Sequence, residues 1–238
     1  MVKKNIKNWD NKTWVSSKRY IQSFNSFLLK QIKLNKDSYL LDIGCWRGKI
    51  LGHLNSTLKL KNKPIGIDIE RHVDRDKRIN FKKIDAIRYL NKDKTKFDLI
   101  LIKQTIHFFK FEEIKKLISV CKTKLNHKGK ILVFTLDTSH NEIPSFLLMK
   151  KKLKKSLNRD KKIIKLICRL YPRSKSRKFS FKVNINRKIY IKMIKNRYIS
   201  TLLDLSLSEI SKGIDEIKFK YNKKLSFNDK LICLILDK

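Results

Sequence analysis

The chain has 238 residues, 41% of them hydrophobic and 10% aromatic, which suits one large domain and excludes a disordered protein. Its 59 Lys and Arg outnumber its 21 Asp and Glu, and the formal charge of +38 attracts polyanions such as nucleic acid, anionic lipid or acidic metabolites. Lys, Ile and Asn are abundant throughout the chain, and AT-rich codons encode all three. Coding bias is therefore an equal explanation of the charge.

Signals for export, membrane insertion and disulfides are missing from the sequence. Residues 1–12 are polar and basic, with no apolar segment behind them, and the longest apolar runs, 131–136 and 231–236, are too short to span a bilayer. The four cysteines are widely spaced, without a Cys-x-x-Cys pair. We therefore expect a cytoplasmic protein with reduced thiols, no transmembrane segment and no metal site.

Two hydrophobic periodicities alternate in the first 136 residues. Apolar residues at helical spacing predict helices at 14–32, 49–58 and 111–125. Short apolar runs bounded by charges or turn residues predict buried strands at 39–43, 64–69, 79–84, 97–102 and 130–136. Strands that alternate with helices in this way predict a parallel sheet covered on both faces.

The remaining residues are less regular. Segments 144–170, 187–203 and 206–221 have helical spacing, and segments 178–185 and 230–237 look like strands. Internal repeats and Gly/Ser linkers are absent from the sequence. We therefore expect a single domain with an insertion near its end.

The most informative segment is residues 40–50, Leu-Leu-Asp-Ile-Gly-Cys-Trp-Arg-Gly-Lys-Ile, where a buried strand runs through a glycine turn into a helix. Glycines let a backbone approach a ligand closely, and the helix N-terminus adds N–H donors. The spacing does not fit a dinucleotide turn, because Trp46 and Lys49 stand where later glycines belong. It does not fit a P-loop either, since three residues separate the glycines and Ile50 has no hydroxyl.

The turn resembles the Asp-x-Gly-x-Gly-x-Gly motif of class I S-adenosylmethionine-dependent methyltransferases, with Trp46 in place of the middle glycine. Further segments resemble the family's later motifs in the same order. These are the end of the second strand at 65–70, the third-strand motif at 81–86, the fourth strand and its loop at 97–108, and the start of the fifth strand at 125–133. Together they cover about residues 37–136.

The resemblance implies an α/β fold: a doubly wound, mostly parallel seven-stranded sheet with a helical cap inserted before the last strand. It divides the chain into an N-terminal lid helix (1–36), a cofactor-binding core (37–136) and a substrate cap (137–238). It also implies S-adenosylmethionine as cofactor. The residues implied to bind it are Asp42, Gly44, Cys45, Gly48, Asp68, Asp85, Ala86 and Gln104.

Three carboxylates have separate expected roles at this cofactor site. Asp42 would accept hydrogen bonds from the turn's amides or cap the following helix. Asp68, at the tip of the second strand, would accept both ribose hydroxyls. Asp85 would face the adenine amino group, or would cap the helix that begins at Ala86.

For the substrate side, four residues are candidates. His107 follows the fourth strand and is either a general base or a half-buried histidine that lines the site. Tyr20 lies in the segment that resembles the lid helix of small-molecule methyltransferases. Arg197 and Tyr198 lie in a segment that resembles the cap of trans-aconitate methyltransferase relatives, where Arg197 would clamp an acidic acceptor or form a surface ion pair.

The favoured interpretation is a methyltransferase acting on a small-molecule acceptor, with an acidic acceptor as one option. One alternative is an RNA methyltransferase, because the stretch 150–192 holds 18 basic residues, aromatic residues and a single acidic residue, Asp160. The Asn-Pro-Pro-Tyr motif of base-amino methyltransferases is missing after the fourth strand. The other alternative, a non-catalytic relative, follows from Trp46.

Overall fold

Seven strands form one sheet in the order β3-β2-β1-β4-β5-β7-β6 in the computed structural model, which describes residues 13–238. Strands β1 to β5 are parallel, β7 is antiparallel to β5, and β6 is antiparallel to β7. The predicted doubly wound, mostly parallel sheet is therefore confirmed. The strands are β1 (Leu40–Ile43), β2 (Ile65–Asp68), β3 (Asn80–Lys83), β4 (Phe97–Lys103), β5 (Leu125–Leu136), β6 (Lys175–Asn186) and β7 (Lys224–Asp237).

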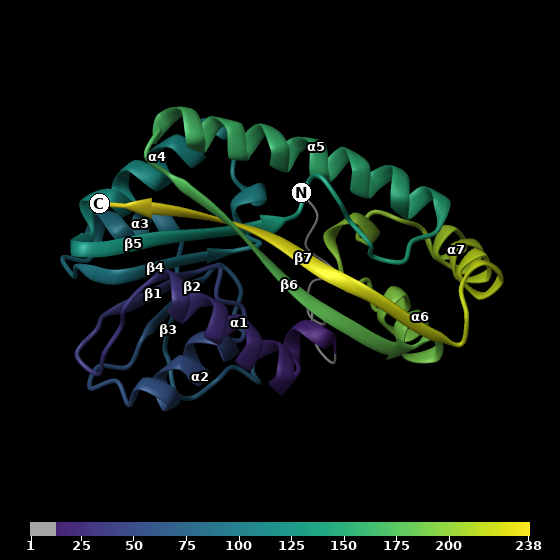
Figure 1. The fold of residues 1–238 in the computed structure, drawn as a ribbon, viewed down its shortest axis with the longest axis horizontal. Helices are drawn as coiled ribbons and strands as arrows, with labels where there is room; N and C mark the ends of the chain where they lie inside the picture. Colours follow the sequence, from purple (N-terminus) through teal and green to yellow (C-terminus); the bar gives the residue numbers. More distant parts are fainter. Residues whose placement is uncertain (1–12) are drawn as a thin grey trace.

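Helices cover both faces of this sheet, and two of them lie beyond its end (Figure 1). The long α5 runs along one side of the molecule, while α6 and α7 lie beside the far ends of β6 and β7. The helices are α1 (Lys18–Gln31), α2 (Lys49–Leu58), α3 (Ala86–Lys92), α4 (Phe111–Thr123), α5 (Leu147–Leu170), α6 (Arg187–Lys195) and α7 (Leu207–Lys220), with short 3-10 helices η2 (Trp14–Ser16), η3 (Ile106–Phe108) and η4 (Ser200–Leu202).

Alternate residues of the central strands supply two separate hydrophobic cores, because successive side chains of a strand point to opposite faces. In β4, Leu99 and Leu101 join the core that includes α1, α2 and the cap. Ile100 and Ile102 join the opposite core, with α3, α4 and the second half of α5. Burial on both faces explains why β4 has a continuous apolar sequence rather than an alternating one.

Strands β5, β6 and β7 are longer than predicted. Strand β5 begins at Leu125 and includes the expected turn at 126–129, through a register shift opposite residues 97–99 of β4. Strands β6 and β7 pair continuously from Lys175↔Ile235 to Asn186↔Lys224 and form a ribbon that extends beyond the parallel strands to α6 and α7 (Figure 1). The added segments are rich in polar residues, and the added part of β7 has only two apolar residues, Leu225 and Phe227, so the apolar signal there is short.

Two predicted helices are interrupted. The segment 14–32 divides into η2 and α1, because Ser17 has extended backbone angles and its side chain accepts a hydrogen bond from the Tyr20 N–H (3.2 Å). The segment 187–203 divides into α6 and η4. Arg197, between them, has a φ of +53°, which a helix does not allow.

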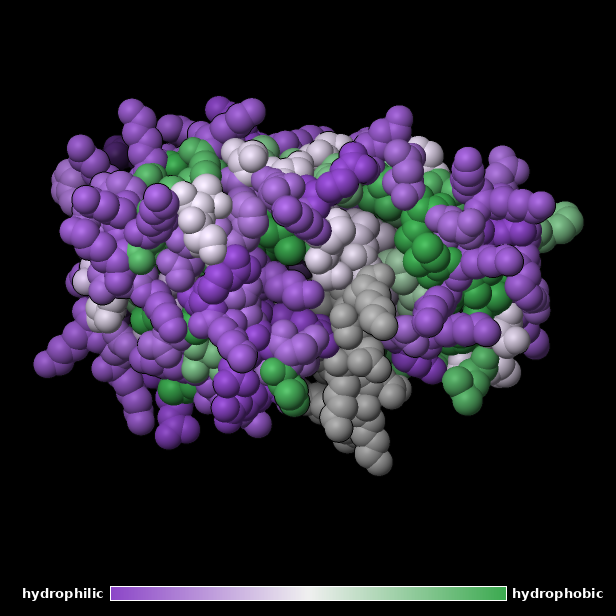
Figure 2. All heavy atoms as spheres, turned by 90° about the horizontal axis from the view of Figure 1, so that it is seen from below, coloured by the Kyte–Doolittle hydropathy of each residue, from purple (hydrophilic) through white to green (hydrophobic). Residues whose placement is uncertain are grey.

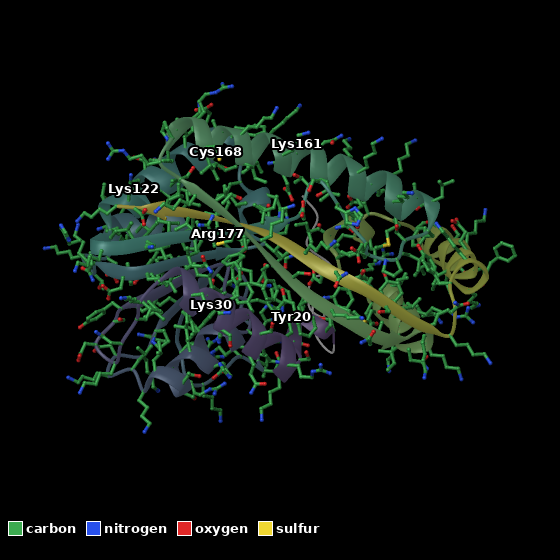
Figure 3. All side chains as sticks on the ribbon, in the orientation of Figure 1. Tyr20, Lys30, Lys122, Lys161, Cys168 and Arg177 are labelled. Atoms are coloured by element: carbon green, nitrogen blue, oxygen red, sulfur yellow. The ribbon has the colours of Figure 1, made fainter. Side chains whose placement is uncertain are left out.

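Polar side chains are spread over the surface in the two views of Figures 2 and 3. Hydrophilic residues cover most of the face in Figure 2, and hydrophobic residues are more frequent toward the end that carries α6 and α7. Side chains that end in nitrogen project all round the outline in Figure 3, including Lys161 on the outer side of α5. Among the described residues, no helix is both long and apolar enough to cross a membrane.

Candidate functional site

A cavity of about 760 Å³ opens at the carboxyl ends of the parallel strands, the usual ligand edge of doubly wound sheets. The loops after β1, β2, β3 and β4 form one half of its lining, which we call the sheet-edge half. Helix α5, the turn 198–204, η2 and Asp229 of β7 contribute to the other half, the cap half. Segments up to 216 residues apart in sequence, from Thr13 to Asp229, therefore meet around one space.

The glycine turn needs its glycines. Gly44 and Gly48 have φ values of +73° and +68°, in the left-handed region. A Cβ atom at Gly44 would lie 2.2 Å from Thr105 Oγ1, and one at Gly48 would lie 2.1 Å from Ile79 Cδ1. The Gly44 N–H donates to the Ile67 carbonyl (2.9 Å), which joins the turn to β2. Both glycines line the cavity, as predicted.

Trp46 also has a left-handed backbone, with a φ of +53°, at the position where the resembling motif has glycine. Its ring lies 3.8 Å, centroid to centroid, from that of His72 in the loop after β2, and the Arg47 guanidinium lies 5.2 Å from it. The left-handed conformation costs a non-glycine residue about 1 kcal/mol or more. Packing of the indole on its two neighbours helps to offset this cost.

Asp68 fixes the loops on both sides of it. Its Oδ2 accepts the Trp46 N–H (2.9 Å) and its Oδ1 accepts the Glu70 N–H (3.0 Å). It lines the cavity, as predicted from its place at the end of β2. The carboxylate is therefore held in one orientation by backbone donors.

Asp42 differs from the prediction. The turn amides do not bond to it, since those of Gly44 and Cys45 both donate to the Ile67 carbonyl. The Asp42 side chain is buried and faces the cavity, and its Oδ1 has no hydrogen-bond partner among the described residues. Burial raises the pKa of this carboxyl to about 7, although Lys103 opposes the shift. The expectation that Asp42 accepts from the turn or caps α2 is wrong.

The other predicted cofactor residues also line the cavity. Asp85 is the N-cap of α3 and accepts the Arg88 N–H (2.9 Å), while Ala86 opens the helix. Gln104 has a φ of +53°, and its Oε1 accepts a hydrogen bond from Lys103 Nζ (3.2 Å). The Cys45 thiol is buried beside two carboxylates, and burial above all raises its pKa, so it stays protonated.

His107 lies in η3 and lines the cavity, as predicted. Its Nε2 is buried without a hydrogen-bond partner among the described residues. Burial, and then the positive charge of Arg159, lower the pKa of His107 to about 4. The imidazole is therefore neutral at physiological pH, and a conjugate acid of this strength makes it a weak general base.

Asp160 is the residue that sequence reasoning missed. It comes from α5, faces the same cavity, and is only 3% exposed. Its Oδ1 has no partner in the described chain, and burial raises its pKa to about 6. Its position in a buried helical stripe, with Leu153 before it and Ile163 after it, is the signal that could have identified it.

Two predicted substrate residues lie outside the cavity lining. Tyr20 is fully buried between α1 and β6, with its ring 5.6 Å from that of Phe179 (Figure 3). The Arg197 guanidinium donates to the carbonyls of Leu202 and Leu203, so it closes the turn after α6. The expected substrate-binding roles of Tyr20 and Arg197 are therefore not supported, because neither side chain lines the cavity.

Tyr198, the remaining predicted substrate residue, does line the cavity. Its hydroxyl lies 2.9 Å from that of Tyr190, and its ring lies 5.3 Å from that of Trp14. The Trp14 indole N–H in turn donates to buried Asp229 (2.9 Å). These contacts join η2, α6 and β7 into one wall. Among all described residues, no group of three His, Cys, Asp or Glu side chains is placed to hold a metal ion.

The fold is that of solved methyltransferase structures. A S-adenosylmethionine-dependent methyltransferase from Archaeoglobus fulgidus matches 93% of this chain and 95% of its own length, with 19% identity and a TM-score of 0.55. A protein from Anabaena variabilis, assigned as a methyltransferase of an antibiotic biosynthesis pathway, matches 88% and 95%, with 14% identity and a TM-score of 0.60. A phosphoethanolamine N-methyltransferase from Haemonchus contortus matches 90% of this chain and 52% of its own, with 16% identity and a TM-score of 0.51.

Sequence comparison adds nothing to this likeness. No protein-family model matches the chain, and no curated protein sequence matches it. Identities of 14–19% establish a shared fold and leave the reaction to be argued from the site. The predicted resemblance of the cap to trans-aconitate methyltransferases is not confirmed.

Proposed function

We propose that this protein is a S-adenosylmethionine-dependent methyltransferase that acts on a small-molecule acceptor. The observation that carries the proposal is the single cavity in which the glycine turn, Asp68 and Asp85 face His107 and the cap. A methyl donor bound in the sheet-edge half would then meet an acceptor in the cap half. The four free cysteines of the protein suit the reducing cytoplasm.

The residues of the sheet-edge half fit this cofactor. Gly44 and Gly48 allow the left-handed turn to pack against Thr105 and Ile79, where a Cβ atom would collide, and both line the cavity. Asp68 can accept hydrogen bonds from the ribose hydroxyls. Asp85 follows the end of β3 and could accept one from the adenine amino group. The unpartnered Oδ1 of Asp42 is a suitable acceptor for the ammonium of the methionyl part.

The chain has little chemistry to supply, because the bound sulfonium provides both the methyl group and its own leaving group. The protein orients the acceptor and excludes water from the reacting atoms. Neutral His107 is suited to orienting the acceptor through a hydrogen bond. Asp160, whose pKa of about 6 is nearer to neutral, is the better candidate to receive a proton from it.

Calorimetric titration with S-adenosylhomocysteine tests this proposal. We expect binding, with Asp68→Ala weakening it by roughly 1–3 kcal/mol because a charged acceptor of two hydroxyls is lost. Asp98→Ala is the matched control, since Asp98 also accepts a backbone amide (Tyr39 N–H, 2.8 Å) and a second donor (Asn126 Nδ2, 2.8 Å) but does not line the cavity. Absence of binding by the wild type at millimolar ligand contradicts the proposal.

A further inference from the structure

The charge of the cap half of the cavity is opposite to that of the segment that builds it. Residues 137–238 contain 27 Lys and Arg against nine Asp and Glu. From this segment, the described cavity lining takes Asp160, Asp204 and Asp229 and no lysine or arginine. A lining that simply followed the composition would hold three basic residues for each acidic one. The excess of acids is therefore a property of the cavity.

Asp160 is the strongest case among these acids. The buried residues of α5 are Met149, Leu153, Asp160, Ile163 and Ile167, spaced at three, four and seven positions along one helix face. The next residue, Lys161, is exposed on the outer side of the helix (Figure 3). Asp160 thus occupies a core position in a helix whose other face is basic.

The burial of Asp160 lowers stability unless a ligand compensates. At 3% exposure its Oδ1 has no partner among the described residues. A carboxylate in that state costs several kcal/mol relative to water, whereas an apolar residue at the same position would stabilise the helix packing. Stability therefore gives no reason for an aspartate here, and recognition of a ligand does.

The neighbouring unpartnered atoms define what the ligand must offer. Thr201 Oγ1, 9% exposed in η4, and His107 Nε2 also lack partners in the described chain, and both residues line the same cavity. An ionised carboxylate only accepts hydrogen bonds, and a hydroxyl and a neutral imidazole can each accept one. An ammonium group supplies three N–H donors and the opposite charge.

Neutral and aromatic groups of the wall are compatible with a cation, while the positive charge of Arg159 acts on both His107 and Asp160 and opposes it. The low pKa of His107 keeps the imidazole neutral, so it does not repel a positive group. Tyr198, Phe108 and Phe109 add aromatic faces to the lining, which attract cations. Asp229 is already engaged by the Trp14 indole and Asp204 is exposed, which leaves Asp160 as the buried carboxylate whose Oδ1 has no partner among the described residues.

We infer that the cap half of the cavity binds an ammonium group, and therefore that the methyl acceptor is a small amine. This inference rests on the proposed function, since it names the substrate class of the same site. It replaces the expectation of an acidic acceptor, which depended on Arg197. The guanidinium of that residue is bonded to backbone carbonyls outside the cavity lining.

The test is a calorimetric comparison of amines with carboxylates of similar shape. Ethanolamine is paired with glycolate, and phenethylamine with 3-phenylpropionate. Each is titrated at about pH 7.5, above the pKa of Asp160, into the protein alone and into the protein saturated with S-adenosylhomocysteine. We expect at least one amine to bind about 10-fold or more tightly than its carboxylate partner.

Two variants locate the effect. Asp160→Asn removes the charge at constant shape and should reduce the amine preference about 10-fold. Asp215→Asn makes the same charge change on the surface of α7, where the carboxylate is paired with Lys218, and should leave the preference unchanged. If Asp160→Asn does not fold by circular dichroism, Asp204→Asn on the exposed rim should still lower the preference measurably.

The outcomes separate the two proposals. Equal or tighter binding of the carboxylates, or no binding of any amine at tens of millimolar, overturns the inference. Amine binding without S-adenosylhomocysteine binding overturns the proposed function and leaves the amine site standing. S-adenosylhomocysteine binding with no amine preference overturns the amine inference and leaves the proposed function standing.

Discussion

The two halves of the cavity treat their polar groups in opposite ways. In the sheet-edge half, Asp68 and Asp85 are held by backbone amides, with bonds of 2.9–3.0 Å from Trp46, Glu70 and Arg88. In the cap half, Asp160 Oδ1 and Thr201 Oγ1 have no partner among the described residues. The carboxylates of Asp68 and Asp85 are therefore held without a ligand, whereas these two cap atoms are not.

The two halves differ in which unfavourable free energy they contain in the absence of a ligand. The sheet-edge half stores backbone strain, since Trp46 and Gln104 have φ values of +53°. The cap half carries a desolvation cost, because its buried polar atoms without partners have lost their hydrogen bonds to water and formed none in the protein. A ligand that enters the first half finds preorganised acceptors, whereas one that enters the second half completes the hydrogen bonding itself.

Asp42 can break this comparison, because it lies in the sheet-edge half and its Oδ1, like the Nε2 of His107 in the same half, has no partner among the described residues. Its pKa rises from 3.8 in the unfolded chain to about 7 in the fold. Between these values the native state binds a proton that the unfolded state does not, so the free energy of unfolding falls as pH rises from about 4 to 7. Asp42→Asn cannot ionise and should remove this contribution to the slope, while the contribution of Asp160 below about pH 6 remains.

We expect Asp42→Asn to be more stable than wild type at about pH 8 by roughly 2–4 kcal/mol, and to bind S-adenosylhomocysteine more weakly. Urea unfolding at several pH values measures the first effect and calorimetry the second. Asp215→Asn, an exposed carboxylate on α7, should keep the wild-type slope. A pH slope in Asp42→Asn that is unchanged from wild type contradicts the burial of an ionisable group at this position.

The sheet-edge half could be predicted because its residues follow their strands directly. Asp42, Gly44 and Asp68 stand within or immediately after short buried strands, and parallel strands bring their carboxyl ends to one edge. The mostly parallel seven-stranded sheet was therefore predicted from the sequence through the family resemblance, and so was the place of the turn at its ligand edge. The hydrogen bonds were not, since the partner of the turn amides is a carbonyl of β2.

The cap half could not be predicted in the same way. Asp160, Tyr198 and Thr201 meet through the packing of α5 on the turn after α6, and no local pattern specifies that packing. Arg197 was chosen for its charge, but its left-handed backbone and its bonds to the carbonyls of residues 202 and 203 make it a turn residue. Tyr20 was chosen for its place in the lid helix, and the pairing of α1 with β6 buries it.

Trp46→Gly tests how much the left-handed backbone and the indole packing of Trp46 each contribute to stability. Glycine adopts the φ of +53° without cost but loses the indole packing on His72 and gains freedom in the unfolded chain. We expect a net loss of about 1 kcal/mol in the free energy of unfolding, with S-adenosylhomocysteine affinity within about 3-fold of wild type. His72→Ala should be non-additive with it in denaturant unfolding. A large gain in affinity would mean that the indole occupies ligand space.

The smallest expected effect compares one substitution in the two halves. Thr201→Val replaces a buried hydroxyl without a partner by a methyl group, so the free energy of unfolding should stay unchanged or rise by up to about 1 kcal/mol. Thr105→Val in the sheet-edge half removes a hydroxyl that donates to the Lys103 carbonyl (3.1 Å). The free energy of unfolding of this variant should therefore fall by about 1 kcal/mol. Urea unfolding of both variants measures the difference. If Thr201→Val destabilises as much as Thr105→Val, the cap hydroxyl has a partner and the contrast between the halves fails. If Thr201→Val is neutral and also weakens phenethylamine binding, the hydroxyl serves the ligand and not the fold.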